Sequence, residues 1–345
     1  MQDEIAAAVV AALKVSLLEG GGASRTSPTS STEAYTLYLQ ARAIIANAPQ
    51  LTDCERAIGY LRHAVKLDPT FARAWAALAI DRTYAYWFLT GGKHEDVLAE
   101  AGQAAEQALK LDPKLSDAHL AMAQIAYYLN WDWARAEAEI NRALTLDPGN
   151  APSLFTAANI ALTRGQFAHA VAHAQKAAAR DPLDAWNHGM VASAYLASGK
   201  LAESEAAWRQ ALELAPTMSQ MHLLYGYVLA TDHKPAAALA QMEQETDQRY
   251  REVGRALVLD ALNRKSEADR ALAEAETNYP EVVQYPIALV YANRNDPTKA
   301  LAWLDRAYQL HDGWLPTWLP WDPLLNNLKS DPRYKAFRQK LNLPD

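Results

Sequence analysis

Cysteine occurs once in this 345-residue chain, at Cys54, which excludes an intramolecular disulfide framework and any cysteine-based metal site. Long apolar runs are missing as well. No stretch reaches the roughly 18 consecutive apolar residues that span a bilayer, and the first residues lack the basic and then apolar regions of a signal peptide. The sequence therefore predicts a soluble chain without an export signal. It leaves the compartment undecided, with the cytoplasm favoured over the periplasm.

Motifs for nucleic-acid binding and for catalysis are also missing. The net charge is -7 and no long basic run interrupts it, which disfavours contact with nucleic acid. Gly20 to Gly22 lie in a Ser/Thr linker rather than between a strand and a helix, so they do not form a phosphate-binding loop. His169 and His173 are four residues apart, but no third zinc ligand accompanies them. We expect no enzymatic activity, no metal and no cofactor.

What the chain does contain is a repeated amphipathic helix pair. Half of its residues are hydrophobic, with much alanine and few β-branched residues, which is typical of closely packed helices. Leu183 to Pro216 is one clean copy of the pair, in which Gly199 ends the first helix and Pro216 closes the second. A single pair cannot bury its apolar faces, so the copies are expected to stack.

The copies follow a fixed period. The prolines that end the second helices are Pro69, Pro113, Pro148, Pro182 and Pro216, and the last three intervals are 35, 34 and 34 residues. The copy at Leu183 to Pro216 places these residues at the packing positions: His188, Val191, Ala192, Tyr195, Ser204, Trp208, Ala211 and Pro216. Period and pattern resemble the tetratricopeptide repeat (TPR). The resemblance implies an all-α, right-handed superhelical solenoid of about eight helix pairs, in which Asn130, Asn263 and Asn293 replace Gly199 as left-handed helix ends.

The repeats are predicted to fill residues 32–312. Residues 1–19 form an amphipathic helix, and residues 20–31 have the composition of a flexible linker. That first helix is interpreted either as a packing strap or as the last helix of a domain upstream. Residues 313–345 are rich in tryptophan and proline, and we expect them to cap the last apolar face, with partner binding as the alternative. The insertion Tyr84 to Asp96 carries several aromatic residues, for which packing is favoured over ligand contact.

Three stretches together resemble a narrower group. They are Gln2 to Leu18, Trp131 to Pro148, and the tail beginning at Trp321. The set is similar to the C-terminal region of bacterial multidomain signalling proteins, in which a winged-helix domain or a class III adenylate or guanylate cyclase precedes such repeats. The resemblance implies that Gln2 to Leu18 is a junction to an upstream domain. No catalytic or DNA-contacting residue of that group has a counterpart in this chain.

The first helices of successive repeats are expected to line a concave groove. The positions offset from the packing pattern are largely apolar and aromatic, and the predicted partner-binding residues are Arg73, Tyr84, Met122, Ile125, Tyr128, Phe155, Asn159, Trp186, Met190 and Tyr227. Such a groove favours an apolar peptide or protein partner, or an upstream domain of the same polypeptide, over a carboxylate clamp. Three alternatives remain open: the chain's own N- or C-terminal segment fills the groove, the repeats drive self-association, or the insertion senses a small molecule.

Overall fold

Antiparallel helix pairs make up most of the fold. The computed structural model describes residues 29–45, 51–86 and 94–343, and in these residues it contains helices and no strand. The N-terminal helix, most of the linker and the core of the aromatic insertion lie outside the described residues. The solenoid predicted from the 34-residue period is confirmed.

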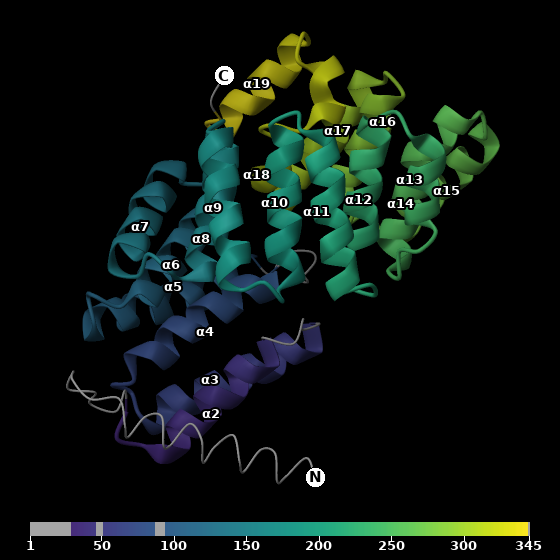
Figure 1. The fold of residues 1–345 in the computed structure, drawn as a ribbon. Coiled ribbons are helices and arrows are strands. Elements are labelled where there is room, and N and C mark those ends of the chain that lie inside the picture. The colour runs from purple at the N-terminus through teal and green to yellow at the C-terminus, as the bar shows by residue number, and fades with distance from the viewer. Residues whose placement is uncertain (1–28, 46–50, 87–93, 344–345) are drawn as a thin grey trace, which may run out of the picture.

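Eight pairs follow one another along the solenoid (Figure 1). They are α2 (Thr32–Ile45) with α3 (Leu51–Leu67), α4 (Ala72–Ala85) with α5 (His94–Leu111), α6 (Ser116–Gln124) and its continuation η2 (Ile125–Leu129) with α7 (Trp133–Leu146), α8 (Ala151–Thr163) with α9 (Phe167–Arg180), α10 (Ala185–Ala197) with α11 (Leu201–Leu214), α12 (Met221–Thr231) with α13 (Pro235–Met242), α14 (Gln248–Leu259) and η3 (Asp260–Leu262) with α15 (Lys265–Asn278), and α16 (Gln284–Asn293) with α17 (Pro297–Gln309).

Small residues set the distance between the paired helices. Ala158, Ala170 and Ala192 are completely buried, and short side chains let helix axes approach closely. Trp208 of α11 packs against α10 within the same pair. A Cβ added at Gly189 would lie 3.1 Å from its ring, so glycine makes room for the indole.

A ring nitrogen ties each of four turns between repeats to the helix that follows it. Six residues after the turn proline, Trp75, His119, His188 and His222 bond the carbonyl oxygens of Pro69, Pro113, Pro182 and Pro216 at 2.9 to 3.1 Å. A carbonyl oxygen can only accept, so Nε2 of each histidine carries the proton. The large residue that the repeat pattern places early in the first helix therefore also secures the preceding turn.

The left-handed helix ends match the prediction only in part. Gly199 and Asn263 have φ values of 72° and 59° as expected. The prediction was wrong for Asn130 and Asn293, because the left-handed residues there are Trp131 and Asn295, with φ of 54° and 55°. In the first case η2 is a π-helix, whose wider turn absorbs an extra residue and delays the helix end.

Met242 lies in a socket made by two glycines. A Cβ at Gly254 would lie 2.3 Å from the Met242 sulfur and one at Gly226 would lie 2.4 Å from its methyl carbon. We expect Gly254→Ala to lower the free energy of unfolding by about 1–3 kcal/mol through overpacking. Met242→Ala in the same chain should recover part of that loss, as measured by urea unfolding. Additive effects of the two changes would contradict the socket.

The C-terminal segment lies against the repeats rather than beyond them. It consists of α18 (Trp314–Trp318), η4 (Pro323–Leu328) and α19 (Pro332–Lys340). The segment packs on the last pair through contacts of η4 with α16 and of α19 with α17, and α18 also reaches α8 in the middle of the solenoid. Figure 1 shows this segment in yellow, with α18 among the teal helices of the central repeats.

Candidate functional site

The concave side of the solenoid is occupied by the chain's own tail, residues 310–343. The carbonyl oxygen of Pro316 accepts hydrogen bonds from the hydroxyls of Tyr127, at 3.0 Å, and Thr163, at 2.9 Å. The indole of Trp133 donates to the carbonyl of Leu341 at 2.8 Å. Since the partners belong to α7, α8 and η2, the tail joins the third and fourth repeats to the eighth. The tail therefore contacts the first helices of the third and fourth repeats, which the repeat pattern predicts to line the groove.

Aromatic ring contacts also join the third repeat to residues 308–311. The Trp131 ring stacks on the His311 ring with centroids 4.3 Å apart, and it also meets the Tyr308 ring at 5.3 Å. Within the tail, Trp318 packs against Trp321 at 4.8 Å. The side chains that fill the groove are at most 6% exposed: Trp314, Leu315, Trp318, Leu319 and Trp321.

Two carboxylates, that of the half-buried Asp312 and that of the buried Asp322, hold the tail at its start and its middle. Asp312 accepts the backbone N–H groups of Trp314 and Tyr285, and Asp322 accepts the Tyr285 hydroxyl at 2.8 Å and the Leu324 N–H. Burial raises the pKa of each carboxyl to about 6, against the opposing effect of these hydrogen bonds. Both groups serve as acceptors for the tail backbone and for Tyr285.

The predicted groove residues divide into a buried and an accessible set. Six of them have between 2% and 6% of their surface exposed: Met122, Ile125, Tyr128, Asn159, Met190 and Tyr227. Arg73 is exposed, and Tyr84, Phe155 and Trp186 are half-buried. The structure thus places these six side chains in the protein interior.

Asn159 is the most polar member of the buried set. Its Nδ2 donates to the Tyr128 hydroxyl at 3.1 Å, whereas its Oδ1 has no hydrogen-bond partner among the residues that the structure describes. Burial raises the pKa of the Tyr128 phenol well above its ordinary value, so the phenol stays neutral and can serve as both acceptor and donor. Asn159 and Tyr128 therefore form a buried hydrogen-bonded pair.

The accessible aromatic side chains are Tyr84, Phe155 and Trp186, and together with Leu183 we call them the aromatic edge. The helices α8 and α10, which carry Phe155 and Trp186, contact each other. Leu183, in the turn before α10, is 78% exposed. Asp184 caps α10 by accepting the Trp186 N–H at 2.8 Å. Its carboxylate is also close enough to Tyr84 to raise the pKa of that phenol, after the larger effects of burial and of Cys54. Tyr84 of the second repeat is therefore brought near the start of α10.

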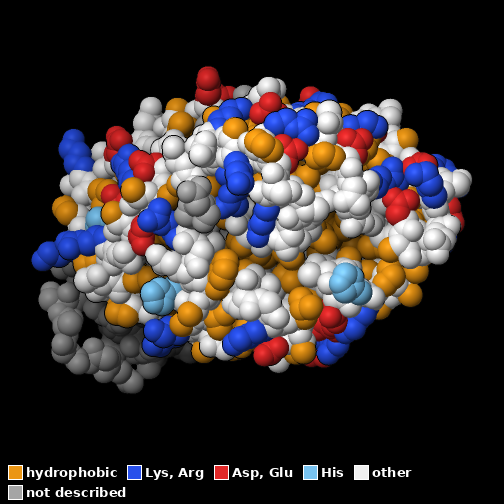
Figure 2. Space-filling view, turned by 90° about the horizontal axis from the view of Figure 1, so that it is seen from above, with side chains coloured by type: hydrophobic (Ala, Val, Ile, Leu, Met, Phe, Trp, Pro, Cys, Tyr) orange, Lys and Arg blue, Asp and Glu red, His pale blue; other side chains and the backbone are white. Residues whose placement is uncertain are grey.

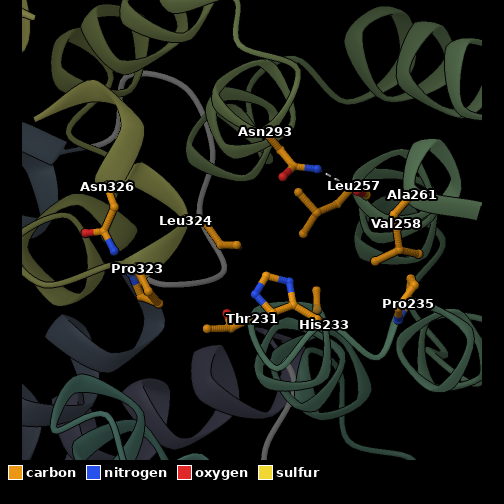
Figure 3. Close-up of a pocket in the computed structure, with 11 residues that line it drawn as sticks. Thr231, His233, Pro235, Leu257, Val258, Ala261, Asn293, Pro323, Leu324 and Asn326 are labelled. Carbon is orange, nitrogen blue, oxygen red and sulfur yellow. Dashed lines mark hydrogen bonds between the residues drawn. The ribbon is translucent and has the colours of Figure 1, made fainter. Parts of the chain in front are cut away.

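A second accessible feature is a pocket of about 450 Å³ on another part of the molecule (Figure 3). It lies where α12, α14 and α16 end and is closed on one side by η4 of the tail. Sequence reasoning did not indicate it, because its walls come from residues 230–235, 257–261, 293 and 323–326. The return of the tail adds the wall that η4 supplies to the ends of α12, α14 and α16, of which α14 contacts the other two directly.

The part of the chain that the structure describes has no candidate metal site. It contains no group of three or more histidine, cysteine, aspartate or glutamate side chains placed to hold a metal ion. Burial, followed by Lys176 and His169, lowers the pKa of His173. Among the same residues, no helix combines the length and the apolar character that crossing a membrane requires. On the face shown in Figure 2, basic and acidic side chains are interspersed.

Comparisons with known proteins agree with the repeat pattern. Residues 190–250 match the family model described as tetratricopeptide repeat. No curated protein sequence gives a significant match. The human IFIT1 dimer with m7Gppp-AAAA has a TM-score of 0.62 at 14% identity, covering 80% of this chain and 72% of that one. The complex Cut9–Hcn1 has a TM-score of 0.58 at 14% identity, covering 91% and 57%.

A TPR protein of Thermus thermophilus covers 57% of this chain and 99% of its own, with 17% identity and a TM-score of 0.47. The two likenesses with TM-scores above 0.5, both at 14% identity, show the fold and nothing beyond it. Together with the eight helix pairs, the match at residues 190–250 makes this chain an all-α solenoid of tetratricopeptide-like repeats.

Proposed function

We propose that this chain is a non-catalytic protein-binding module that receives an apolar peptide or protein segment along the aromatic edge. The observation that supports the proposal is the division of the predicted groove residues. Six of them are at most 6% exposed, whereas Phe155 and Trp186 are half-buried, and Leu183, three residues before Trp186, is 78% exposed. Half-buried aromatic side chains on a rigid scaffold are the usual anchors of an interface.

The partner is expected to carry apolar side chains and a basic group. Asp184 lies beside Trp186 and near Tyr84, and the chain as a whole has a net charge of -7. A cation near Asp184 gains from this field, while a carboxylate is repelled. The RNA found with the human structure belongs to that protein, and at 14% identity it says nothing about this one.

A display experiment tests the aromatic edge. Peptides selected from a random library on the full chain should combine apolar residues with Lys or Arg. The double variant Phe155→Ser/Trp186→Ser should weaken their binding at least about 30-fold, because hot-spot aromatics contribute 2 kcal/mol or more. Calorimetric titration of a selected peptide provides the measurement.

The matched control changes two half-buried aromatic residues on the outer helices, Phe167 of α9 and Trp303 of α17. Phe167→Ser/Trp303→Ser should leave the affinity unchanged, and both double variants should melt cooperatively. If the control pair weakens binding as much as the first pair, or if neither does, the aromatic edge is not the site.

The finer proposal is that the module regulates an output domain of a bacterial signalling protein. It is supported by the resemblance of Gln2 to Leu18 and of the tail to the repeat regions of multidomain cyclases and winged-helix regulators. The genomic reading frame upstream of Met1 tests it, because a cyclase or winged-helix domain encoded in frame is expected there. A stop codon or an unrelated domain in that frame would remove the support.

A further inference from the structure

The pocket at the ends of α12, α14 and α16 has an apolar interior and a polar rim. Leu257 and Val258 of α14 are at most 3% exposed and form one wall, and Pro323 and Leu324 of η4 form the opposite one (Figure 3). A volume of about 450 Å³ lies within the usual range for small-molecule sites. Because α16 and η4 both contribute, a molecule bound here would touch the repeats and the tail at once.

Two polar groups at the rim are held as hydrogen-bond acceptors. The Nδ2 group of Asn293 donates to the carbonyl of Leu257 at 3.2 Å, so its Oδ1 remains to accept. The Thr231 hydroxyl donates to the Tyr227 carbonyl at 2.9 Å, which leaves its oxygen lone pairs available. Thr231 and Asn293 are also the last residues of α12 and α16, where helix carbonyls carry partial negative charge.

Two further polar side chains at the rim, those of His233 and Asn326, are not committed to a hydrogen bond as donor or acceptor in the described part of the chain. Neither the His233 ring nor the Asn326 amide has a hydrogen-bond partner within residues 29–45, 51–86 and 94–343. Figure 3 shows His233 and Asn326 on either side of Leu324. Each can donate or accept, so they can complete the bonding of a ligand that the two fixed acceptors have oriented.

No aspartate, glutamate, lysine or arginine is among the eleven residues that line the pocket. The charges next to it are paired with one another: Asp232 with Lys234 at 2.6 Å, and Asp260 with Arg294 at 2.6 Å. A charged ligand would lose its hydration in the apolar interior without meeting an unpaired carboxylate, ammonium or guanidinium group. A neutral ligand avoids that cost.

We propose that this pocket binds an uncharged small molecule with an apolar body and an N–H donor edge, such as an aromatic amide, lactam or amino-heterocycle. The donor edge bonds Asn293 Oδ1 and Thr231 Oγ1, while the body packs between Leu257 and Leu324. The site is separate from the aromatic edge, and bound ligand holds η4 against α14 and α16.

Four nearly isosteric probes test the ligand class. They are benzamide, acetophenone, which lacks the donor, the anion benzoate and the cation benzamidinium. Titration followed by two-dimensional NMR on the full chain should give saturable shifts of the Asn293 and Asn326 side-chain amides with benzamide. Benzamide should bind at least about tenfold more tightly than each of the other three, because each of them leaves an acceptor unpaired or buries a charge.

Variants place the binding in this pocket. Ala261 is exposed on η3 and lines the cavity, so Ala261→Trp should fill it and remove benzamide binding. Ala302, exposed on α17, supplies the control Ala302→Trp, which should bind normally. The proposal is overturned if benzamide shows no saturable binding, if a charged probe binds equally well, or if binding survives in Ala261→Trp.

Discussion

Removal of residues 313–345 should abolish cooperative unfolding of the solenoid rather than yield an open groove. The deletion takes away the buried side chains of Trp314, Trp318 and Trp321, and the loss of one such side chain costs about 3–5 kcal/mol. It also leaves the hydroxyls of Tyr127 and Thr163 facing a groove that has lost their shared acceptor, the Pro316 carbonyl. The summed loss is comparable to the whole stability of an ordinary domain, which is about 5–15 kcal/mol.

Single substitutions make the same prediction measurable when the deleted chain does not fold. Trp318→Ala should lower the free energy of unfolding by about 3–5 kcal/mol. Trp303→Ala on the outer face of α17, where the ring is half-exposed, should cost about 1 kcal/mol or less. Urea unfolding followed by circular dichroism gives both values.

The contrary result would have a definite meaning. If the chain without residues 313–345 melts cooperatively within a few degrees of the parent and gains affinity for peptides, the tail is a detachable plug. The six buried groove residues, Tyr128 and Asn159 among them, would then be the partner site after all. A stable but non-binding truncated chain would contradict both the prediction and that alternative.

The repeat architecture could be predicted from sequence because its determinants are local. The spacing of Pro113, Pro148 and Pro182 and the alternation of alanine with large residues specify helix pairs and their stacking. The left-handed ends were harder to place. The π-turn of η2 moves the left-handed helix end from Asn130 to Trp131. A spacing of 34 residues between repeats does not reveal a shift of one residue.

The occupant of the groove depends on contacts between residues far apart in the chain, such as Tyr127 with Pro316 and Trp133 with Leu341. The sequence signal is confined to the segment itself. Trp314, Leu315, Trp318 and Leu319 lie on one face of a short helix, which predicts that this face is buried. Burial against the last repeat satisfies that pattern as well as insertion between the repeats does, so the pattern does not identify the occupant of the groove.

The buried polar side chains were not predicted from the sequence. The one with the fewest compensating polar contacts is Asp81 of α4. The side chain is completely buried, and neither carboxylate oxygen has a hydrogen-bond partner in the described part of the chain. Its nearest cation is Arg42, with Nη1 3.6 Å from Oδ1, and that side chain is 40% exposed. Burial raises the pKa of Asp81 from 3.8 to about 7, although Arg42 acts in the opposite direction.

This carboxyl should make the protein less stable as the pH rises from about 4 to about 7. Within that window the folded state binds a proton that the unfolded state has already released, so the free energy of unfolding falls with increasing pH. Above the window the folded protein carries a buried charge. Asp81→Asn keeps the volume and removes the charge, and should therefore stabilise the protein at pH 8 by roughly 2–4 kcal/mol.

Urea unfolding at pH 4.5 and pH 8 separates this effect from a general change in packing, because the two proteins should have similar stability at the lower pH and diverge at the higher one. Glu203→Gln, an exposed change in the first turn of α11, should leave the pH profile of the parent intact.

Arg42→Gln gives the complementary test. Since it removes the only nearby cation among the described residues, it should lower stability at pH 8 in the parent but not in Asp81→Asn. A variant Asp81→Asn that is less stable than the parent at pH 8 would mean that Arg42 compensates the buried carboxylate fully.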